Sequence, residues 1–377
     1  MNYPPTLSLI KNLKARGDNI CVLTSYKDID AEEICTEIGA DIFFTTVCYD
    51  IHKSAFQKMI DIPHINSELK NRVAELYDSS SIIWIMTSIS LKYIGNILDD
   101  KRYIMYMYEL AQEIRYYDSI PFLKVNLAKL LHNAQAVIEC EYNRAHIVKA
   151  WFGLDKVPYV IPNKPMVGGE IRKNAQIHNE EAREKIKKIE KKKIIIYQGI
   201  IDAERPIVPL INAVNMMDDS YALLIMSSNI DQLKDYESEK IVLIPFIKPP
   251  YHLEVTSWAY IGVLMYTSVS GVKATSPLNS IYCAPNKLFE YSKFGIPMLG
   301  NDIPGLKTAL EANKIGVCYS SNTPDEICRC VELIEEKYLE FSKNTKQFFE
   351  KSDTYAVIDQ ILHEIEVTRE TEERYNE

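Results

Sequence analysis

Short apolar runs that alternate with segments of helical spacing constrain this sequence more than any other feature. The runs are apolar throughout, whereas a strand with one solvated face alternates between apolar and polar residues. Strands buried on both faces belong to parallel sheets, in which helices form the crossovers. The pattern therefore predicts two doubly wound, Rossmann-like α/β domains in series. The predicted strands lie at residues 20–23, 42–46, 82–86, 103–107, 136–138 and 159–161 in the first half, and at 194–198, 222–226, 241–244, 261–265 and 297–299 in the second.

The chain of 377 residues is long enough for two domains, each with its own core. We expect an N-terminal domain over residues 1–163 and a C-terminal domain over residues 164–352. A charged segment, 353–377, is predicted to form a helix that could pack back on the N-terminal domain. Helical spacing also predicts helices at 7–15 and 122–132.

The start of the chain departs from the doubly wound pattern, because helix-like residues follow the sequence YPPT directly. A domain of this kind normally opens with a strand. Either the first strand is missing from this chain or the start codon has been misplaced. In both cases we expect a defective first sheet edge.

Composition limits the classes of partner. A formal net charge of −9 leaves no basic excess to neutralise phosphates, so we expect no nucleic-acid partner. The eight cysteines include no zinc-ligand spacing, which favours free thiols in a reducing cytoplasm. The run EEAREKIKKIEKKK, residues 180–193, is either the solvated face of a helix or a basic helix touching anionic lipid headgroups. We therefore expect a cytoplasmic protein, with peripheral contact at the inner membrane face left open.

The first turn of the predicted C-terminal domain, QGIIDAERPIV, contains the elements of an anion site. Gly199 follows the strand and permits a close approach of backbone to ligand. Arg205 precedes Pro206, a residue type favoured at the first helical position, so the guanidinium and the helix N-terminus could bind one anion. The alternative is a surface arginine on an ordinary loop.

A second short helix, predicted at 286–294, carries Lys287 and Glu290 on one face. Gly295 is expected to end this helix with a positive φ, and Pro297 prevents its continuation. Three residues rise about 4.5 Å along a helix, so the lysine could meet a diphosphate while the glutamate accepts both hydroxyls of the neighbouring ribose. The alternative is a surface ion pair.

At these positions the sequence resembles the nucleotide-sugar glycosyltransferases of GT-B fold, most closely glycosyltransferase family 4. The matching segments, in order, are YPPTLSLIKNLKARGDNICVLT, VPYVIPNKP, YQGIIDAERPIVPLINA, IPFIKPPYHLEVTSWAYIGVLMY and APNKLFEYSKFGIPMLGNDIPGL. The resemblance implies two Rossmann-like domains that face each other across a cleft. The donor nucleotide would lie in the C-terminal domain and the acceptor in the N-terminal one.

The resemblance also implies roles for individual residues. The first glutamate of a pair that many members carry is absent, because Tyr282 stands eight positions before Glu290. A basic residue that often follows the glycine is replaced by Ile200. These departures leave the donor sugar and the stereochemistry open. The implied donor site consists of Gly199, Arg205 and Lys287 for the phosphates, Glu290 for the ribose, Phe246 and Ile247 beside the nucleobase, and Leu288.

In the N-terminal domain, Glu109 stands where family members often have an acidic residue near the reacting sugar. It follows the strand predicted at 103–107, so it could orient the acceptor or serve as a base. The alternative is a helix-capping or surface carboxylate. His252, in PPYHLEVT, is expected to begin the helix after the base-binding loop, with a ligand role as the alternative.

The function implied is transfer of a sugar, hexosyltransferase-like, from a nucleotide diphosphate sugar to a glycan or lipid-linked acceptor in bacterial surface polysaccharide synthesis. No metal and no cofactor besides the donor are expected, because Arg205, Lys287 and a helix end can balance the leaving diphosphate. Two alternatives stay open: a nucleotide-sugar epimerase, and a catalytically impaired GT-B partner subunit.

Overall fold

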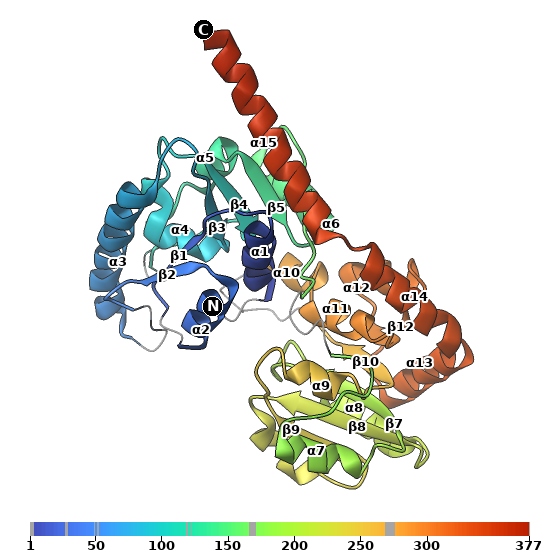
Figure 1. Cartoon of the computed structure of the whole chain (residues 1–377). Helices are drawn as coiled ribbons and strands as arrows, with labels where there is room; N and C mark the ends of the chain where they lie inside the picture. The colour runs from blue at the N-terminus through green and yellow to red at the C-terminus, as the bar shows by residue number, and fades with distance from the viewer. Residues whose placement is uncertain are drawn as a thin grey trace. The chain divides into compact units, whose positions relative to one another are not determined.

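The computed structural model describes residues 4–26, 29–48, 50, 53–117, 120, 122–165, 171–267 and 276–376. The chain forms two compact units (Figure 1). The first unit comprises Met1–Pro162 and Thr354–Glu377, and the second unit comprises Asn163–Asp353. None of the described helices combines the length and the apolar character that a membrane-spanning helix needs.

The second unit is built on one six-stranded parallel sheet in the order β12-β11-β10-β7-β8-β9. Taking β7 as its first strand, this is the doubly wound order, in which the first and fourth strands are neighbours at the centre. The strands are β7 (Lys193–Gln198), β8 (Tyr221–Ser227), β9 (Ile241–Pro245), β10 (Ile261–Leu264), β11 (Met298–Asn301) and β12 (Gly316–Tyr319).

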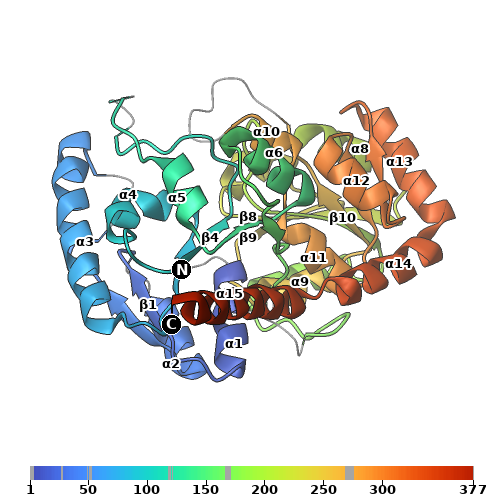
Figure 2. The same ribbon diagram turned by 90° about the horizontal axis from the view of Figure 1, so that it is seen from above.

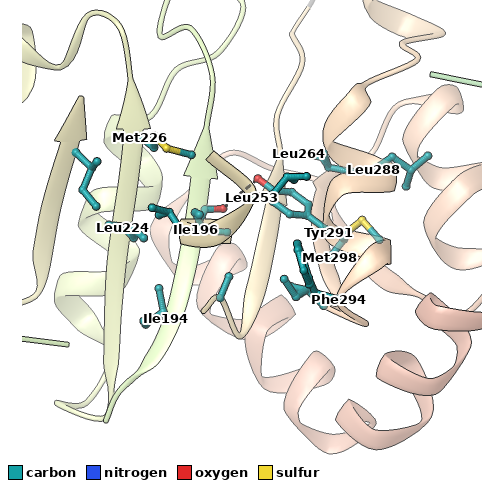
Figure 3. Packing of buried hydrophobic residues seen from close by; sticks show 14 of the residues in the cluster. Ile194, Ile196, Leu224, Met226, Leu253, Leu264, Leu288, Tyr291, Phe294 and Met298 are labelled. Atoms are coloured by element: carbon teal, nitrogen blue, oxygen red, sulfur yellow. Dashed lines mark hydrogen bonds between the residues drawn. The ribbon is translucent and has the colours of Figure 1, made fainter. Parts of the chain in front are cut away.

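Helices cover both faces of this sheet and enclose two cores. On one face, α11 and α9 pack on the strands through Leu288, Tyr291 and Leu253 (Figure 3). On the other face, α8 and α13 bury Leu210 and Ile327. The helical elements are α7 (Glu180–Lys187), α8 (Val208–Met216), the 3₁₀ segment η3 (Ile230–Tyr236), α9 (His252–Thr256), α10 (Leu278–Ile281), α11 (Asn286–Lys293), α12 (Pro304–Glu311), α13 (Pro324–Glu336) and α14 (Tyr338–Lys351).

The first unit has the same kind of parallel pairing but two separate sheets, the pair β1-β2 and the four strands β3-β4-β5-β6. Its strands are β1 (Cys21–Thr24), β2 (Asp41–Phe44), β3 (Ile83–Met86), β4 (Tyr103–Met107), β5 (Ala136–Glu139) and β6 (Tyr159–Val160). Its helical elements are α1 (Pro4–Ala15), α2 (Ile29–Ile38), α3 (Ala55–Leu76), η1 (Ser88–Ser90), α4 (Leu91–Ile94), η2 (Gly95–Ile97), α5 (Leu127–Asn133), α6 (Tyr142–Phe152) and α15 (Thr354–Asn376).

The expectation of a defective first sheet edge was wrong in its location. Helix α1 precedes β1, and among the described residues no strand comes before it. In the doubly wound order the first strand lies at the centre of the sheet, so a sheet without it is interrupted in the middle. The helix α3 spans the interruption, because Leu23 of β1 and Ile83 of β3 pack against the same cluster around Ile65 and Leu69.

Helix α15 belongs to the first unit although it ends the chain. Asp359 forms an ion pair with Arg16 beyond the end of α1, and Glu364 accepts a hydrogen bond from the Tyr159 hydroxyl of β6. Figure 1 and Figure 2 show α15 beside the elements of this unit.

The predicted strands are all confirmed within two residues, and three main differences concern other segments. The strand β12 was not predicted, although it lies within the apolar run IGVCY, residues 315–319. The helix predicted at 122–132 begins only at Leu127, because the Asn126 side chain caps it by accepting the amide proton of Lys129. The basic run 180–193 is helical only to Lys187. Its apolar residues, including Ile186 and Ile189, lie in the core.

Candidate functional site

The carboxyl ends of β7 and β10 define the site in the second unit. These two strands are neighbours in the sheet, and the connections that leave them run in opposite directions along it. In doubly wound sheets, ligands bind in the crevice at this point. Gly199 directly follows β7, and Tyr266 lies two residues after β10.

Gly199 is required by its backbone conformation. Its φ of +129° lies in a region that side chains rarely adopt, and its N–H donates to the carbonyl of Met226 at 3.0 Å. A Cβ at this position would lie 3.4 Å from the Lys287 Nζ, which is an ordinary contact distance. The lysine of α11 therefore lies against the turn after β7, and the conformation of that turn needs the glycine.

Lys287 holds a buried ammonium against two aromatic rings. The side chain starts in the first turn of α11, and the residue is 9% exposed. Its Nζ lies 4.8 Å from the ring centre of Tyr197 and 5.2 Å from that of Tyr266. Burial and, to a lesser extent, nearby Arg205 lower the pKa of this amine to about 8, whereas Glu290 opposes the shift. Within the described residues, the ammonium contacts these rings and donates no hydrogen bond, so its donors remain available to an anion.

Arg205 is the second cation of the site. Its guanidinium lies 5.3 Å from the ring centre of Tyr266, on which Lys287 also packs. Two acidic neighbours hold it, Asp202 at 2.6 Å and Glu204 at 3.7 Å. The prediction that Pro206 starts the next helix was wrong, because α8 begins at Val208. Arg205 is therefore a loop residue, whose guanidinium can change partner.

The packing of α11 on the sheet fixes the direction of this helix. Tyr291 lies over Gly262 of β10, where a Cβ would come within 2.3 Å of the tyrosine ring, so only glycine allows this approach. Gly295 has a φ of +64°, which confirms that it ends the helix in the left-handed conformation. The N-cap residue Pro285 has no side chain that can accept a hydrogen bond. The first amides of α11 therefore favour a negatively charged group at this end.

Glu290 is buried beside Lys287 but is held by other residues. It is 5% exposed and accepts hydrogen bonds from the Gln198 side-chain amide and from His252 Nε2, the latter at 3.2 Å. The Thr256 hydroxyl donates to Gln198 Oε1 at 2.7 Å. His252 is the first residue of α9, as predicted.

The remaining predicted donor residues differ in what they can offer. Phe246 and Ile247 follow β9, and the first is 53% exposed whereas the second is 9% exposed. The Leu288 side chain lies in the core, so only its backbone could meet a ligand. No role was predicted from the sequence for Gln198, Thr256, Tyr197 or Tyr266. A polar glutamine and a tyrosine at the end of the apolar strand before Gly199 were the available signal for two of them.

Glu109 belongs to the first unit. It lies two residues beyond β4, half-buried, and the preceding carbonyl of Tyr108 accepts a hydrogen bond from Arg144 Nη1 at 3.0 Å. Glu139 ends the neighbouring strand β5 and is fully buried. Burial raises the pKa of this carboxyl to about 8, although Arg144 opposes the shift. Two acidic residues thus lie at the carboxyl edge of this sheet.

Comparison with known proteins shows the fold. No family model and no curated protein matches the chain. The structure of HepE from Anabaena in complex with UDP is similar, with a TM-score of 0.63, 11% identity and 95% of each chain covered. Sucrose-phosphate synthase from Thermosynechococcus elongatus has a TM-score of 0.65 at 14% identity, covering 97% of this chain and 92% of that one. A UDP-N-acetylglucosamine 2-epimerase candidate from Listeria monocytogenes has a TM-score of 0.59 at 12% identity, covering 96% and 92%. The chain has two Rossmann-like domains and the GT-B fold.

Proposed function

We propose that the protein is a glycosyltransferase that moves a sugar from a nucleotide diphosphate sugar to a glycan or lipid-linked acceptor. One observation carries the proposal: the Lys287 ammonium is buried at the strand switch point, 4.8 Å from the Tyr197 ring centre, and donates no hydrogen bond to any residue that the structure describes. A desolvated cation is costly for folding. Its position beside Arg205 and the first turn of α11 suits a diphosphate.

The same groups suit the leaving group of the transfer. As the bond from the sugar to the diphosphate breaks, negative charge grows on the phosphate oxygens. Lys287, Arg205 and the amides of α11 would stabilise this charge in a place of low dielectric constant. We propose that transfer needs no metal ion for this reason. Activity that persists in excess EDTA would support this point, and full loss with rescue by Mg²⁺ would contradict it.

Glu109 is proposed to act on the acceptor. A carboxylate beyond a strand end can orient an acceptor hydroxyl or take its proton. Glu109→Gln keeps the shape and removes the charge, so transfer should fall while donor binding stays unchanged. Equal loss of both would assign Glu109 to structure instead.

UDP-sugars are the first donors to test, because the HepE structures contain UDP and UDP-glucose. We propose a role in bacterial surface polysaccharide synthesis, at the cytoplasmic face of the inner membrane. The fold likeness to an epimerase candidate favours one rival, epimerisation of the donor sugar. A catalytically impaired partner subunit is the other, since Tyr282 replaces an acidic residue that the resemblance implies.

One experiment separates these three. The purified protein is incubated with UDP-, GDP- and ADP-sugars, with and without glycan or lipid-linked acceptors, and nucleotide release and sugar identity are followed. Acceptor-dependent nucleotide release supports transfer. A changed sugar without release indicates an epimerase. Nucleotide binding without any reaction indicates a partner subunit, and no binding at all overturns the proposal.

A further inference from the structure

The carboxylate of Glu290 is the centre of a buried chain of hydrogen bonds that crosses three elements. Gln198 ends β7, His252 and Thr256 lie on α9, and Glu290 lies on α11. Exposures of 4%, 7%, 0% and 5%, in that order, exclude solvent from all four residues. Such a network needs explanation, because burying polar groups together gains little stability over a well-packed apolar core.

The carboxylate determines which end of the Gln198 amide faces it. Because a carboxylate only accepts, Gln198 Nε2 donates to Glu290 Oε2. If the amide turned over, its oxygen would face the carboxylate and the two would repel each other. The Thr256 hydroxyl lies 2.7 Å from Gln198 Oε1 and 3.0 Å from the His252 carbonyl, and its one proton can be donated to either acceptor. The threonine therefore contacts the end of the amide opposite to Glu290.

His252 holds the other oxygen of the same carboxylate. Its Nε2 lies 3.2 Å from Glu290 Oε1 and donates to it. Its Nδ1 is buried and has no hydrogen-bond partner among the described residues, so this imidazole is not optimised for stability. The one bond that the ring makes fixes the position of Glu290.

Lone pairs determine what the held carboxylate can still bind. A carboxylate has about four acceptor positions, two on each oxygen. Gln198 takes one on Oε2 and His252 takes one on Oε1, so one remains on each oxygen as far as the described residues are concerned. Two acceptors at a fixed separation match the two hydroxyls of a ribose, which are also held at a fixed separation. A single hydroxyl would use only half of this arrangement.

We infer that Gln198 and His252, with Thr256 behind the Gln198 amide, are positioning residues that hold Glu290 in the orientation that binds both ribose hydroxyls. The inference rests on the proposed function, because Lys287, one helical turn before Glu290, is taken to hold the diphosphate and the resemblance assigns Glu290 to the ribose. What it adds is the role of the residues that hold this carboxylate, and the preference for ribose over 2′-deoxyribose is its readout.

The test compares ribose selectivity, which a merely structural role would not change. Whichever of UDP, GDP and ADP binds most tightly is titrated calorimetrically, together with its 2′-deoxy counterpart. The parent protein should bind the 2′-deoxy form roughly tenfold or more weakly than the ribose form, because one charge-assisted hydrogen bond is lost. Gln198→Leu and His252→Phe should lower this ratio of the two affinities to about 1–3. Thr256→Val should lower it by a smaller amount.

Two variants keep the test decisive. His252→Gln retains a donor and should recover part of the ratio that His252→Phe loses. Lys287→Met should weaken both ligands equally and leave the ratio unchanged. Melting curves show whether each variant folds. If Gln198→Leu and His252→Phe do not fold, the affinity ratio is measured on Thr256→Val instead.

The outcomes separate the two proposals. A collapsed ratio in the Gln198 and His252 variants supports the inference. A parent protein that binds a nucleoside diphosphate but does not distinguish its deoxy form overturns the inference and leaves the proposed function standing. An unchanged ratio in variants that only lose stability also overturns it. Absence of nucleoside diphosphate binding in the parent overturns both.

Discussion

In the second unit, β7 is paired on both sides, with β10 and β8, and six strands form one sheet. In the first unit, β1 and β2 form a pair that is separate from β3-β4-β5-β6, and no described strand occupies the position that β7 has. The difference appears in burial. All four residues of β1 are half-buried, whereas all seven of β8, its topological counterpart, are fully buried. We infer that a paired central strand is needed to bury the strand beside it completely.

The same difference affects the candidate sites. In the second unit, the end of the central strand supplies Tyr197, Gln198 and Gly199 to the site. In the first unit, the edge residues come from two neighbouring strands of the four-stranded sheet, with Glu109 beyond β4 and Glu139 ending β5. Burial also shifts the pKa values of an ionisable group in each unit, and in opposite directions: it lowers that of Lys287 in the second unit and raises that of Glu139 in the first.

The largest expected effect compares matched leucines on the two counterpart strands. Leu223 of β8 is fully buried and Leu23 of β1 is half-buried. Leu223→Ala should reduce the free energy of unfolding of the second unit by about 3–4 kcal/mol, because it leaves a cavity. Leu23→Ala should cost the first unit only about 1 kcal/mol. Hydrogen exchange measured unit by unit gives both values. Equal losses would show that the central strand does not control burial.

Removing the buried cation should stabilise the second unit while abolishing its function. A pKa lowered from 10.5 to about 8 corresponds to a penalty of about 3 kcal/mol for the charged form. Lys287→Met should recover much of this penalty and raise the melting temperature. The same change should weaken nucleoside diphosphate binding roughly 10- to 100-fold, the range for charge-assisted hydrogen bonds. Lys293→Met, at the other end of α11, is the control. A less stable variant would mean that the ammonium is satisfied in the folded state.

Stability should depend on pH in opposite directions in the two units. The Glu139 carboxyl has a pKa raised from 4.5 to about 8, so the folded first unit binds a proton that the unfolded chain releases in that range. Stability of this unit should therefore fall as pH rises from about 4.5 to about 8. The Lys287 pKa is depressed, so the second unit should gain stability between about pH 8 and 10.5.

Glu139→Gln isolates the acidic contribution. At pH 7 the variant should be up to about 3 kcal/mol more stable in the first unit, since it needs no proton. Near pH 4 the gain should vanish, because the carboxyl is then protonated in both states. Denaturant unfolding at both pH values measures the difference. A gain that is the same at pH 4 would reflect packing and not titration.

The smallest effect concerns the acidic partner of Arg205. Asp202 lies 2.6 Å from the guanidinium and competes with an incoming phosphate. Asp202→Asn should tighten nucleoside diphosphate binding about two- to fivefold, in keeping with the modest energy of partly exposed ion pairs. The affinity for the nucleoside without phosphates should not change. Weaker diphosphate binding would instead show that Asp202 holds Arg205 in its binding position.

The fold could be predicted in large part from the sequence, because strands buried on both faces leave continuous apolar runs. The strand Tyr103–Met107 was predicted to the residue, and the helix carrying Lys287 and Glu290 ends at the glycine that was expected to end it. The strand β12 and the start of α8 were less predictable, since a four-residue run and a proline-containing loop leave weak local signals.

The sequence by itself determined the alternation of strands and helices and the turn residues that permit it, because both follow from local periodicity and backbone preference. Only the tertiary structure decided which side chains meet. Glu290 lies 92 residues from Gln198 and 38 from His252 along the chain, yet it accepts hydrogen bonds from both. Lys287 is desolvated only because Tyr197 and Tyr266 come from neighbouring strand ends. Periodicity reports that a residue is buried, whereas the packing of distant strands and helices determines its neighbours, and those neighbours give the site its chemistry.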